Sequence, residues 1–273
     1  MDNAKSRMAI VAGHICLDIT PAFPNEKICR IDEMFVPGRL IQMGEADVHT
    51  GGAVANTGLA MKILGADVRL MGKVGKDAFG DLVLSKLEEY DASAGMIVSD
   101  GSATSYSVVL APVGIDRIFL HCSGANDTFG MDDIDFSLVG DAALFHFGYP
   151  PLMKNMYSDH GSQLVQLFQK VKSMGVATSL DFAAIDENAA VGKIDWEEIL
   201  SAVLPYVDFF VPSVEELAYM LDRPRYQEWV KRAAGGDITS VLDIEKDVRP
   251  LADRLLDMGA KVILIKCGAP GIY

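Results

Sequence analysis

The sequence predicts an α/β fold in which helices cover both faces of a parallel sheet. From residue 142 onward, short apolar runs alternate with helical stripes of apolar residues. Glycines directly follow several predicted helices, where a residue that tolerates a positive φ ends a helix. Repeated strand and helix units form a parallel sheet, because each helix returns the chain to the edge where the next strand begins. The 273 residues suffice for one large α/β domain or two small ones.

The first strand is predicted over residues 8–15, MAIVAGHI, a short apolar run typical of a buried parallel strand. Asp18 follows this run, and ligands gather outside the carboxyl ends of such strands. From the residues alone, Asp18 is either a ligand-binding residue or an ordinary turn or capping aspartate.

The next predicted elements follow a glycine pair. Gly51 and Gly52 precede an apolar helical pattern, which ends at Gly65. A mostly buried strand over residues 67–74 comes next, and a second helix begins near Ala78.

The glycine pair and Asn56 are suited to a ligand site. Two glycines before a helix let the backbone approach a ligand closely, with N–H groups directed at its oxygens. The Asn56 side chain, one turn into the helix, both donates and accepts hydrogen bonds. Tight packing between strand and helix is the alternative explanation for the two glycines.

Two segments differ from the rest of the chain. Residues 21–50 contain prolines, glycines and short alternating stretches such as residues 39–42, which predict small exposed strands. Residues 102–110 and 117–122 have the same character. We expect these segments, although distant in sequence, to form a small antiparallel sheet.

The second half of the chain carries the repeated units. Strands are predicted over residues 142–147, 176–182, 207–211 and 261–265, and helical stripes over 164–171, 196–204 and 248–258. Ser213, with Glu216 three residues later, forms a capping-box signature at the start of another helix. Residues 223–243 are charged and less periodic, and they predict a helical surface insertion.

Composition excludes several classes of protein. With 24 basic and 38 acidic residues the net charge is −14, which argues against nucleic acid or an anionic membrane as partner. No apolar run reaches membrane-spanning length. The four cysteines are scattered, and the N-terminus lacks a signal peptide, which favours reduced thiols and a cytoplasmic location. The five histidines lack zinc-site spacing.

The stretch 51–80, with GG-A-V-A-N, a glycine nine residues after Asn56, and then G-K-D-A-F-G, resembles the first signature of the ribokinase-like (PfkB) carbohydrate kinases. The resemblance implies a three-layer αβα sandwich with a small β-sheet lid, in a single domain over residues 1–273. It places the lid at about residues 19–50 and 100–122. Asp18, Gly51, Gly52 and Asn56 match the sugar-binding floor.

The same resemblance implies ATP and Mg²⁺ as cofactors. The segment PSVEEL resembles the family's N-x-x-E motif, so Glu216 is expected to hold Mg²⁺ through water, although Ser213 replaces the usual Asn. Asp181 and the loop containing Lys266, Gly268 and Gly271 are expected to border the nucleotide.

The family's catalytic base belongs to a D-T-T-G-A-G-D motif, which this sequence does not contain up to Tyr273. We therefore expect the base to be C-terminal to Tyr273, the fold to lack its C-terminal part, and the 273 residues alone to be a poor catalyst. Residues 123–129, SGANDTF, imitate the motif, but they resemble the G-A-N turn with which the family leaves its lid.

The resemblance therefore implies ATP-dependent phosphorylation of a sugar or nucleoside hydroxymethyl group, in a homodimer formed through the lid. Apolar lid residues such as Phe35, Val109 and Phe119 are expected on an open sheet that a second copy covers. A non-catalytic sugar-binding relative is one alternative. A nucleotide-linked Rossmann oxidoreductase is another, although the dinucleotide-binding GxGxxG is missing.

Overall fold

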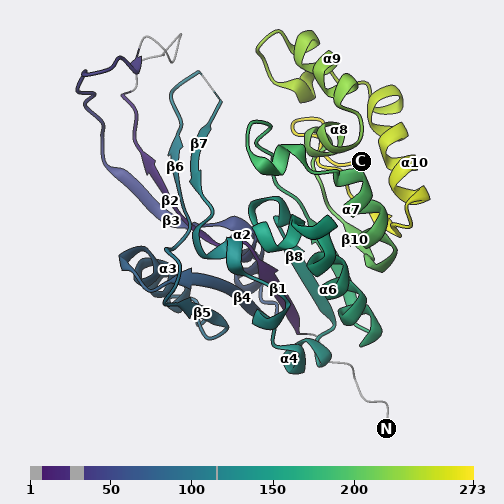
Figure 1. Ribbon diagram of the computed structural model, residues 1–273. Helices are drawn as coiled ribbons and strands as arrows, with labels where there is room; N and C mark the ends of the chain where they lie inside the picture. The colour runs from purple at the N-terminus through teal and green to yellow at the C-terminus, as the bar shows by residue number, and fades with distance from the viewer. Residues whose placement is uncertain (1–7, 25–33, 115) are drawn as a thin grey trace.

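A seven-stranded parallel sheet forms the centre of the computed structural model, which describes residues 8–24, 34–114 and 116–273 (Figure 1). Its strand order is β11-β10-β9-β8-β1-β4-β5, and the pairings between these strands are parallel. The strands are β1 (Ala9–Gly13), β4 (Val68–Gly75), β5 (Met96–Ser99), β8 (Leu144–Gly148), β9 (Ala177–Asp181), β10 (Phe209–Phe210) and β11 (Val262–Ile263).

Helices cover both faces of this sheet, as predicted (Figure 1). Alternate residues of β1 point to opposite faces of the sheet. Ile10 and Ala12 belong to the apolar core on one face, and Ala9 and Val11 belong to the core on the other. The helices are α2 (Gly52–Ile63), α3 (Ala78–Glu88), α4 (Phe136–Gly140), α5 (Lys154–Tyr157), α6 (Ser162–Ser173), α7 (Trp196–Val203), α8 (Val214–Leu221), α9 (Arg223–Ala233) and α10 (Arg249–Asp257). The first core is shared with α6 and α7 and the second with α2 and α3, so the architecture has three layers.

Most elements begin and end near their predicted limits. The α2 helix ends just before Gly65, whose φ is 89°, so the predicted glycine stop is confirmed. The last two strands, β10 and β11, are shorter than predicted, with two residues each. The sequence analysis missed β5, a short strand at the edge of the sheet beside β4.

A second, four-stranded sheet extends away from the first (Figure 1). It contains β2 (Cys16–Pro21), β3 (Ala46–Gly51), β6 (Tyr106–Leu110) and β7 (Ile118–Cys122), in the order β3-β2-β6-β7. The prediction of an antiparallel sheet was wrong at its centre, because β2 pairs with β6 in parallel. Both strands leave the main sheet in the same direction, so only their outer neighbours β3 and β7 run antiparallel to them.

Two further expectations for this small sheet were wrong. Residues 39–42 form no strand with the described segments, and the backbone N–H of Arg39 instead bonds to the Val36 carbonyl at 3.1 Å. Val109 is 6% exposed and faces the covered side of β6, whereas Phe119 is 53% and Phe35 45% exposed. Val109 and Phe119 are opposite each other and lie on the same face, but β6 is an inner strand of this sheet whereas β7 is its edge strand, so only Phe119 remains accessible.

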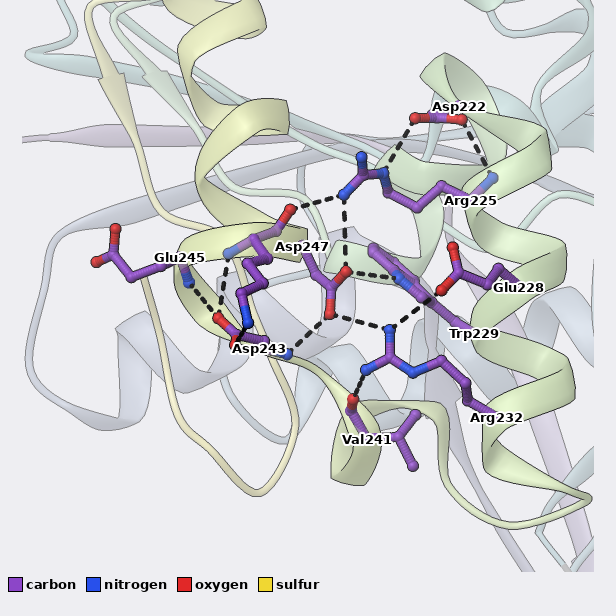
Figure 2. A network of polar contacts seen from close by, with 10 residues as sticks. Asp222, Arg225, Glu228, Trp229, Arg232, Val241, Asp243, Glu245 and Asp247 are labelled. Atoms are coloured by element: carbon purple, nitrogen blue, oxygen red, sulfur yellow. Dashed lines mark hydrogen bonds and ion pairs between the residues drawn. The ribbon is translucent and has the colours of Figure 1, made fainter.

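The predicted insertion over residues 223–243 is helical and is fixed by a buried carboxylate (Figure 2). Asp247, which is 6% exposed, accepts a hydrogen bond from Trp229 Nε1 at 3.2 Å and from Arg232 Nη1 at 3.3 Å. Its Oδ2 atom also accepts from the backbone N–H of Asp243 at 2.8 Å. Trp229 is fully buried, so the insertion packs onto the larger core through this side chain.

Replacing the buried carboxylate should destabilise the whole domain. We expect Asp247→Ala to lower the free energy of unfolding by about 3 kcal/mol, because it leaves buried donors without a partner. The control Glu228→Ala removes a carboxylate that is 64% exposed and 3.7 Å from Arg232, and it should cost less than about 1 kcal/mol. Urea denaturation of both variants measures this difference, and equal losses would contradict the prediction.

Candidate functional site

The Asp18 carboxylate lies directly against the first glycine of the pair. Asp18 is in β2 and Gly51 is at the end of the neighbouring strand β3. A Cβ atom at Gly51 would lie 2.1 Å from Asp18 Oδ2, so any other residue at this position would have to displace the Asp18 carboxylate. The Cys16 thiol, on the same face of β2, donates a hydrogen bond to Asp18 Oδ1 at 3.2 Å. The structure therefore brings Asp18 and the glycine pair together, as predicted.

The second glycine allows α2 to begin against the end of β1. Gly52 has a φ of 84°, and a Cβ there would lie 2.5 Å from the His14 carbonyl oxygen. That carbonyl accepts a hydrogen bond from Val54 N at 3.1 Å. No side chain caps the start of α2. The first turn of this helix consequently presents backbone donors beside Asp18.

Tyr149 joins this floor, although the sequence analysis did not select it. It follows β8 in the left-handed conformation, with φ 66° and ψ 44°, and its backbone N–H donates to the Asp181 carbonyl at 3.1 Å. Its hydroxyl is hydrogen-bonded to Asn56. Burial and then the Asp181 carboxylate raise the pKa of Tyr149 to about 12, so the hydroxyl stays protonated at neutral pH. Its place after a buried strand was the signal that could have identified it.

A second cluster lies at the ends of β9 and β10. Lys266 Nζ forms an ion pair with Asp181 Oδ1 at 2.7 Å, and Lys266 also pairs with Ser213 in a short parallel bridge. Ser213 and Glu216 form the predicted capping box, with Ser213 N donating to Glu216 Oε2 at 2.8 Å. Burial raises the pKa of Glu216, and the nearby Lys266 ammonium partly offsets this effect.

The loop after Lys266 is a tight turn. Cys267 N donates to the Gly271 carbonyl at 2.8 Å, and both Gly268 and Gly271 have positive φ. A Cβ atom at Gly268 would lie 2.6 Å from Thr239 Oγ1, so this glycine lets the loop pack against the insertion. Gly271 has open space around its Cα, so its φ of 104° alone accounts for the glycine.

Tyr149 lies between the floor and the second cluster. Its backbone N–H bonds to Asp181, the charges of Asp181 and Glu216 act on its hydroxyl, and the hydroxyl interacts with Asn56 of the floor. Tyr149 follows β8, Asp181 ends β9 and Glu216 lies in the first turn of α8, so these three residues lie at the carboxyl edge of the main sheet. The carboxyl edge of a parallel sheet is where α/β proteins bind their ligands. A hydroxyl-binding floor beside a lysine and two acidic side chains is suited to holding a polyol next to a phosphate.

The segment that imitates a catalytic turn anchors the small sheet instead. Gly124–Thr128 is a short 3-10 helix, and the Asn126 side chain is fully buried. Asn126 Nδ2 donates to the Ile15 carbonyl at 2.9 Å, and Asn126 Oδ1 accepts from Ile15 N at 3.2 Å. Asp127 Oδ1 accepts from Lys154 N at 3.1 Å. These bonds support the interpretation of residues 123–129 as the turn that leaves the lid.

Neither a membrane-spanning helix nor a cluster of metal-binding side chains is found in the part of the chain that the structure describes. In residues 8–24, 34–114 and 116–273, no helix is long and apolar enough to cross a membrane. The same residues contain no group of three or more His, Cys, Asp or Glu side chains placed to hold a metal ion.

Curated relatives include sugar kinases. A sugar-kinase relative from Pyrococcus horikoshii is 25% identical over 207 residues, which cover 71% of this chain and 63% of that protein. The ribokinase of Staphylococcus aureus is 22% identical over 255 residues, which cover 91% of this chain and 71% of that protein. The chain thus spans less than two thirds of the length of the first of these relatives.

Solved structures share the fold. The fructokinase of Xylella fastidiosa with bound ATP has a TM-score of 0.66 at 18% identity, covering 95% of this chain and 71% of that one. The Arabidopsis thaliana ribokinase complexed with ribose and ATP has a TM-score of 0.64 at 18% identity, covering 96% and 72%. The model of the pfkB family carbohydrate kinases matches residues 10–273. The chain therefore belongs to the pfkB family of carbohydrate kinases.

Proposed function

We propose that this chain binds ATP and a sugar or nucleoside, and that it functions in phosphoryl transfer to a hydroxymethyl group. The observation that carries this proposal is the meeting of two clusters around Tyr149. The floor supplies Asp18, the Gly51–Gly52 turn and Asn56, and the second cluster supplies Lys266 with two acidic side chains. The ATP bound to the fructokinase and the ribose and ATP bound to the ribokinase described above support the same pair of ligands.

Each residue has a stated binding role in this proposal. Asp18 accepts hydrogen bonds from vicinal hydroxyls, and the Asn56 amide both donates and accepts. The amides of the first turn of α2 donate to substrate oxygens. Lys266 offsets phosphate charge, while Gly268 and Gly271 shape the loop beside the nucleotide. We assign no residue of the chain as the general base.

Mg²⁺ fits this arrangement through water. Mg²⁺ keeps several of its waters and usually takes one or two carboxylates together with substrate phosphates. Glu216 Oε2 already accepts a hydrogen bond from Ser213 N, and Asp181 Oδ1 is paired with Lys266. Both carboxylates retain a second oxygen that can accept a hydrogen bond from a metal-bound water. When bound, the ion would offset the negative charge of the phosphates.

Direct binding measurements separate this proposal from its alternatives. Calorimetry with Mg²⁺–ATP, NADH and a panel of pentoses, hexoses and nucleosides should show binding of Mg²⁺–ATP and of at least one sugar or nucleoside. Sugar binding without ATP binding would favour a non-catalytic relative. Binding of NADH without binding of Mg²⁺–ATP or of any sugar or nucleoside would favour an oxidoreductase.

A cytoplasmic location stays a prediction. Cys16, Cys122 and Cys267 are free thiols in the structure.

The substrate role of Asp18 predicts a specific loss of affinity. We expect Asp18→Ala to weaken binding of the best sugar by about 5- to 150-fold, because a buried hydrogen bond to a charged group contributes about 1–3 kcal/mol. Calorimetry measures this change. The control Asp67→Ala removes an exposed carboxylate just before β4, at the other end of the main sheet, and should leave affinity unchanged. Wild-type affinity in Asp18→Ala would remove Asp18 from the site.

The metal role of Glu216 predicts a change in Mg²⁺ dependence. Glu216→Gln preserves the capping box, since Gln also accepts from the N-cap backbone, but it removes the negative charge. We expect ATP binding by this variant to need a higher Mg²⁺ concentration, with sugar affinity unchanged. Glu215→Gln on the same turn is the control. If the Mg²⁺ dependence of Glu216→Gln equals that of the wild type, the role of Glu216 is limited to capping.

Catalysis by this chain should not depend on Asp127. General-base assistance contributes about 10²–10⁴-fold to the rate of a reaction. The Asp127 carboxylate already accepts a hydrogen bond from the backbone N–H of Lys154, so it is not expected to act as that base. We therefore expect Asp127→Ala to leave sugar-dependent ADP release unchanged. A coupled ADP assay over the sugar panel measures this rate. Turnover of several per second that Asp127→Ala abolishes would identify the turn at residues 124–128 as the catalytic loop.

We also propose that the lid sheet forms a homodimer. Phe119 of β7 is 53% exposed, and two-fold association would cover it. Light scattering at micromolar concentration should give twice the mass of the chain. Phe119→Ser should shift the mass toward a monomer, whereas Val230→Ser on the exposed side of α9 should not. A monomeric wild-type protein would contradict the proposal.

A further inference from the structure

Two histidine rings meet where the small sheet joins the main sheet. His14 follows β1, and His121 is in β7 of the lid. Their ring centroids are 5.2 Å apart, with an angle of 47° between the ring planes. The contact therefore joins the base of the site to its lid.

The two rings contain buried nitrogens without a hydrogen-bond partner. Both nitrogens of His14 and the Nε2 atom of His121 are inaccessible, and within the described residues they make no hydrogen bond. The other nitrogen of His121, Nδ1, is hydrogen-bonded to Ser107 Oγ at 3.1 Å. Buried polar atoms without partners are rare in folded proteins, so these three nitrogens indicate a polar group that the protein itself does not supply.

The unpartnered nitrogens lie beside the proposed substrate floor. A Cβ atom at Gly52 would be 2.6 Å from His14 Nδ1, which places this nitrogen against the glycine pair. The ring of Tyr149, whose hydroxyl contacts Asn56, is 6.0 Å from the ring of His14. The Asp18 carboxylate acts electrostatically on His121. The histidine pair therefore adjoins the floor from the lid side.

Both rings are neutral at physiological pH. Burial, together with the neighbouring His121, lowers the pKa of His14 to about 3. Burial also lowers the pKa of His121, against the opposing effect of the Asp18 and Asp127 carboxylates. A neutral imidazole has one N–H donor and one acceptor nitrogen. Two such rings can together bind one hydroxyl group, which donates to one ring and accepts from the other.

We propose that His14 and His121 form a subsite that binds a hydroxyl group of an uncharged polyol and disfavours phosphorylated or carboxylated sugars. The subsite rests on the proposed sugar-binding function and narrows its substrate class. Substrate reaches the nitrogens when β7 separates from the base, and the hydroxyl then replaces the contact between the rings. An anionic substituent finds no positive charge on the rings, and the Asp18 and Asp127 carboxylates that act on His121 repel it.

Binding of matched neutral and anionic ligands tests the substrate class. The pairs are D-ribose with D-ribose 5-phosphate, D-fructose with D-fructose 6-phosphate, and D-glucose with D-gluconate. We expect the best neutral sugar to bind at least about tenfold more tightly than its anionic partner at low ionic strength. The ratio should decrease as salt increases, because salt screens repulsion but does not change a steric clash. Equal or tighter binding of the anion would overturn the proposal, and so would an absence of binding by every ligand.

Variants of His121 test the subsite itself. His121→Phe keeps a ring and removes the nitrogens, so we expect sugar affinity to decrease about tenfold while the melting temperature stays equal or rises. His121→Gln places an amide near the position of Nε2 and should restore most of the affinity. His160→Phe, at an exposed histidine bonded to Glu198, is the matched control and should change nothing. Unchanged sugar affinity in a folded His121→Phe variant would show that the pair is only structural.

The sugar affinities measured in these titrations do not depend on phosphoryl transfer, because the titrations contain no ATP. If sugar binds as expected but Mg²⁺–ATP does not, the proposed kinase function fails and the subsite stands. The opposite result is also possible, in which Mg²⁺–ATP and sugar both bind, His121→Phe binds sugar as tightly as the wild type, and the anionic ligands bind as tightly as the neutral sugars. In that case the subsite fails and the proposed function stands.

Discussion

The Asn126 side chain binds the backbone of Ile15, where the chain passes from the main sheet to the small sheet, and the floor of the site is built beside this junction. The chain leaves the main sheet at β1 and enters the small sheet at β2, so the backbone of Ile15 lies between them. Asn126 bonds to both the N–H and the carbonyl of Ile15, across 111 positions of sequence. A buried backbone group without a partner is costly, and an amide side chain has both the donor and the acceptor required. These two bonds help to fix the start of β2, and with it the position of Asp18.

The neighbouring residues show how closely the floor is packed. Gly51 and Gly52 have no room for a side chain, since Asp18 occupies one side and His14 the other. Tyr149 lies in the left-handed region, which costs a bulky residue on the order of 1–3 kcal/mol. Its backbone hydrogen bond to Asp181 and its contact with Asn56 hold it there. Strain of this kind clusters at functional sites, where the surrounding structure enforces one conformation.

Electrostatics divide the site into two halves. At the floor, the buried imidazoles of His14 and His121 have lowered pKa values, and Asp18 is the neighbouring charge. At the other half, Lys266 lies between Asp181 and the buried Glu216, whose pKa is raised by burial. A half with neutral imidazoles and the Asp18 carboxylate, beside a half that contains a cation, is the separation that the proposed uncharged acceptor and phosphate donor would require.

The sequence by itself determined the features that depend on neighbouring residues. The glycine pair before α2, the stop at Gly65 and the Ser213–Glu216 capping box were predicted and are present, because turn and cap chemistry involves residues a few positions apart. The alternation of strands and helices gave the three-layer fold for the same reason. The family resemblance of residues 51–80 then identified Asn56 as a candidate, and that of the segment VAGHICLDI identified Asp18.

Only the tertiary structure decided the contacts between distant segments. The parallel pairing of β2 with β6, the burial of Val109 and the partners of Tyr149 depend on which strands become neighbours. The contact of His14 with His121 joins residues 107 positions apart, from 14 to 121, and no local pattern marks either of them. Periodicity shows which face of an element is buried, but not which distant side chain lies against it. For that physical reason the sequence located the floor of the site, and the fold supplied the residues that surround it.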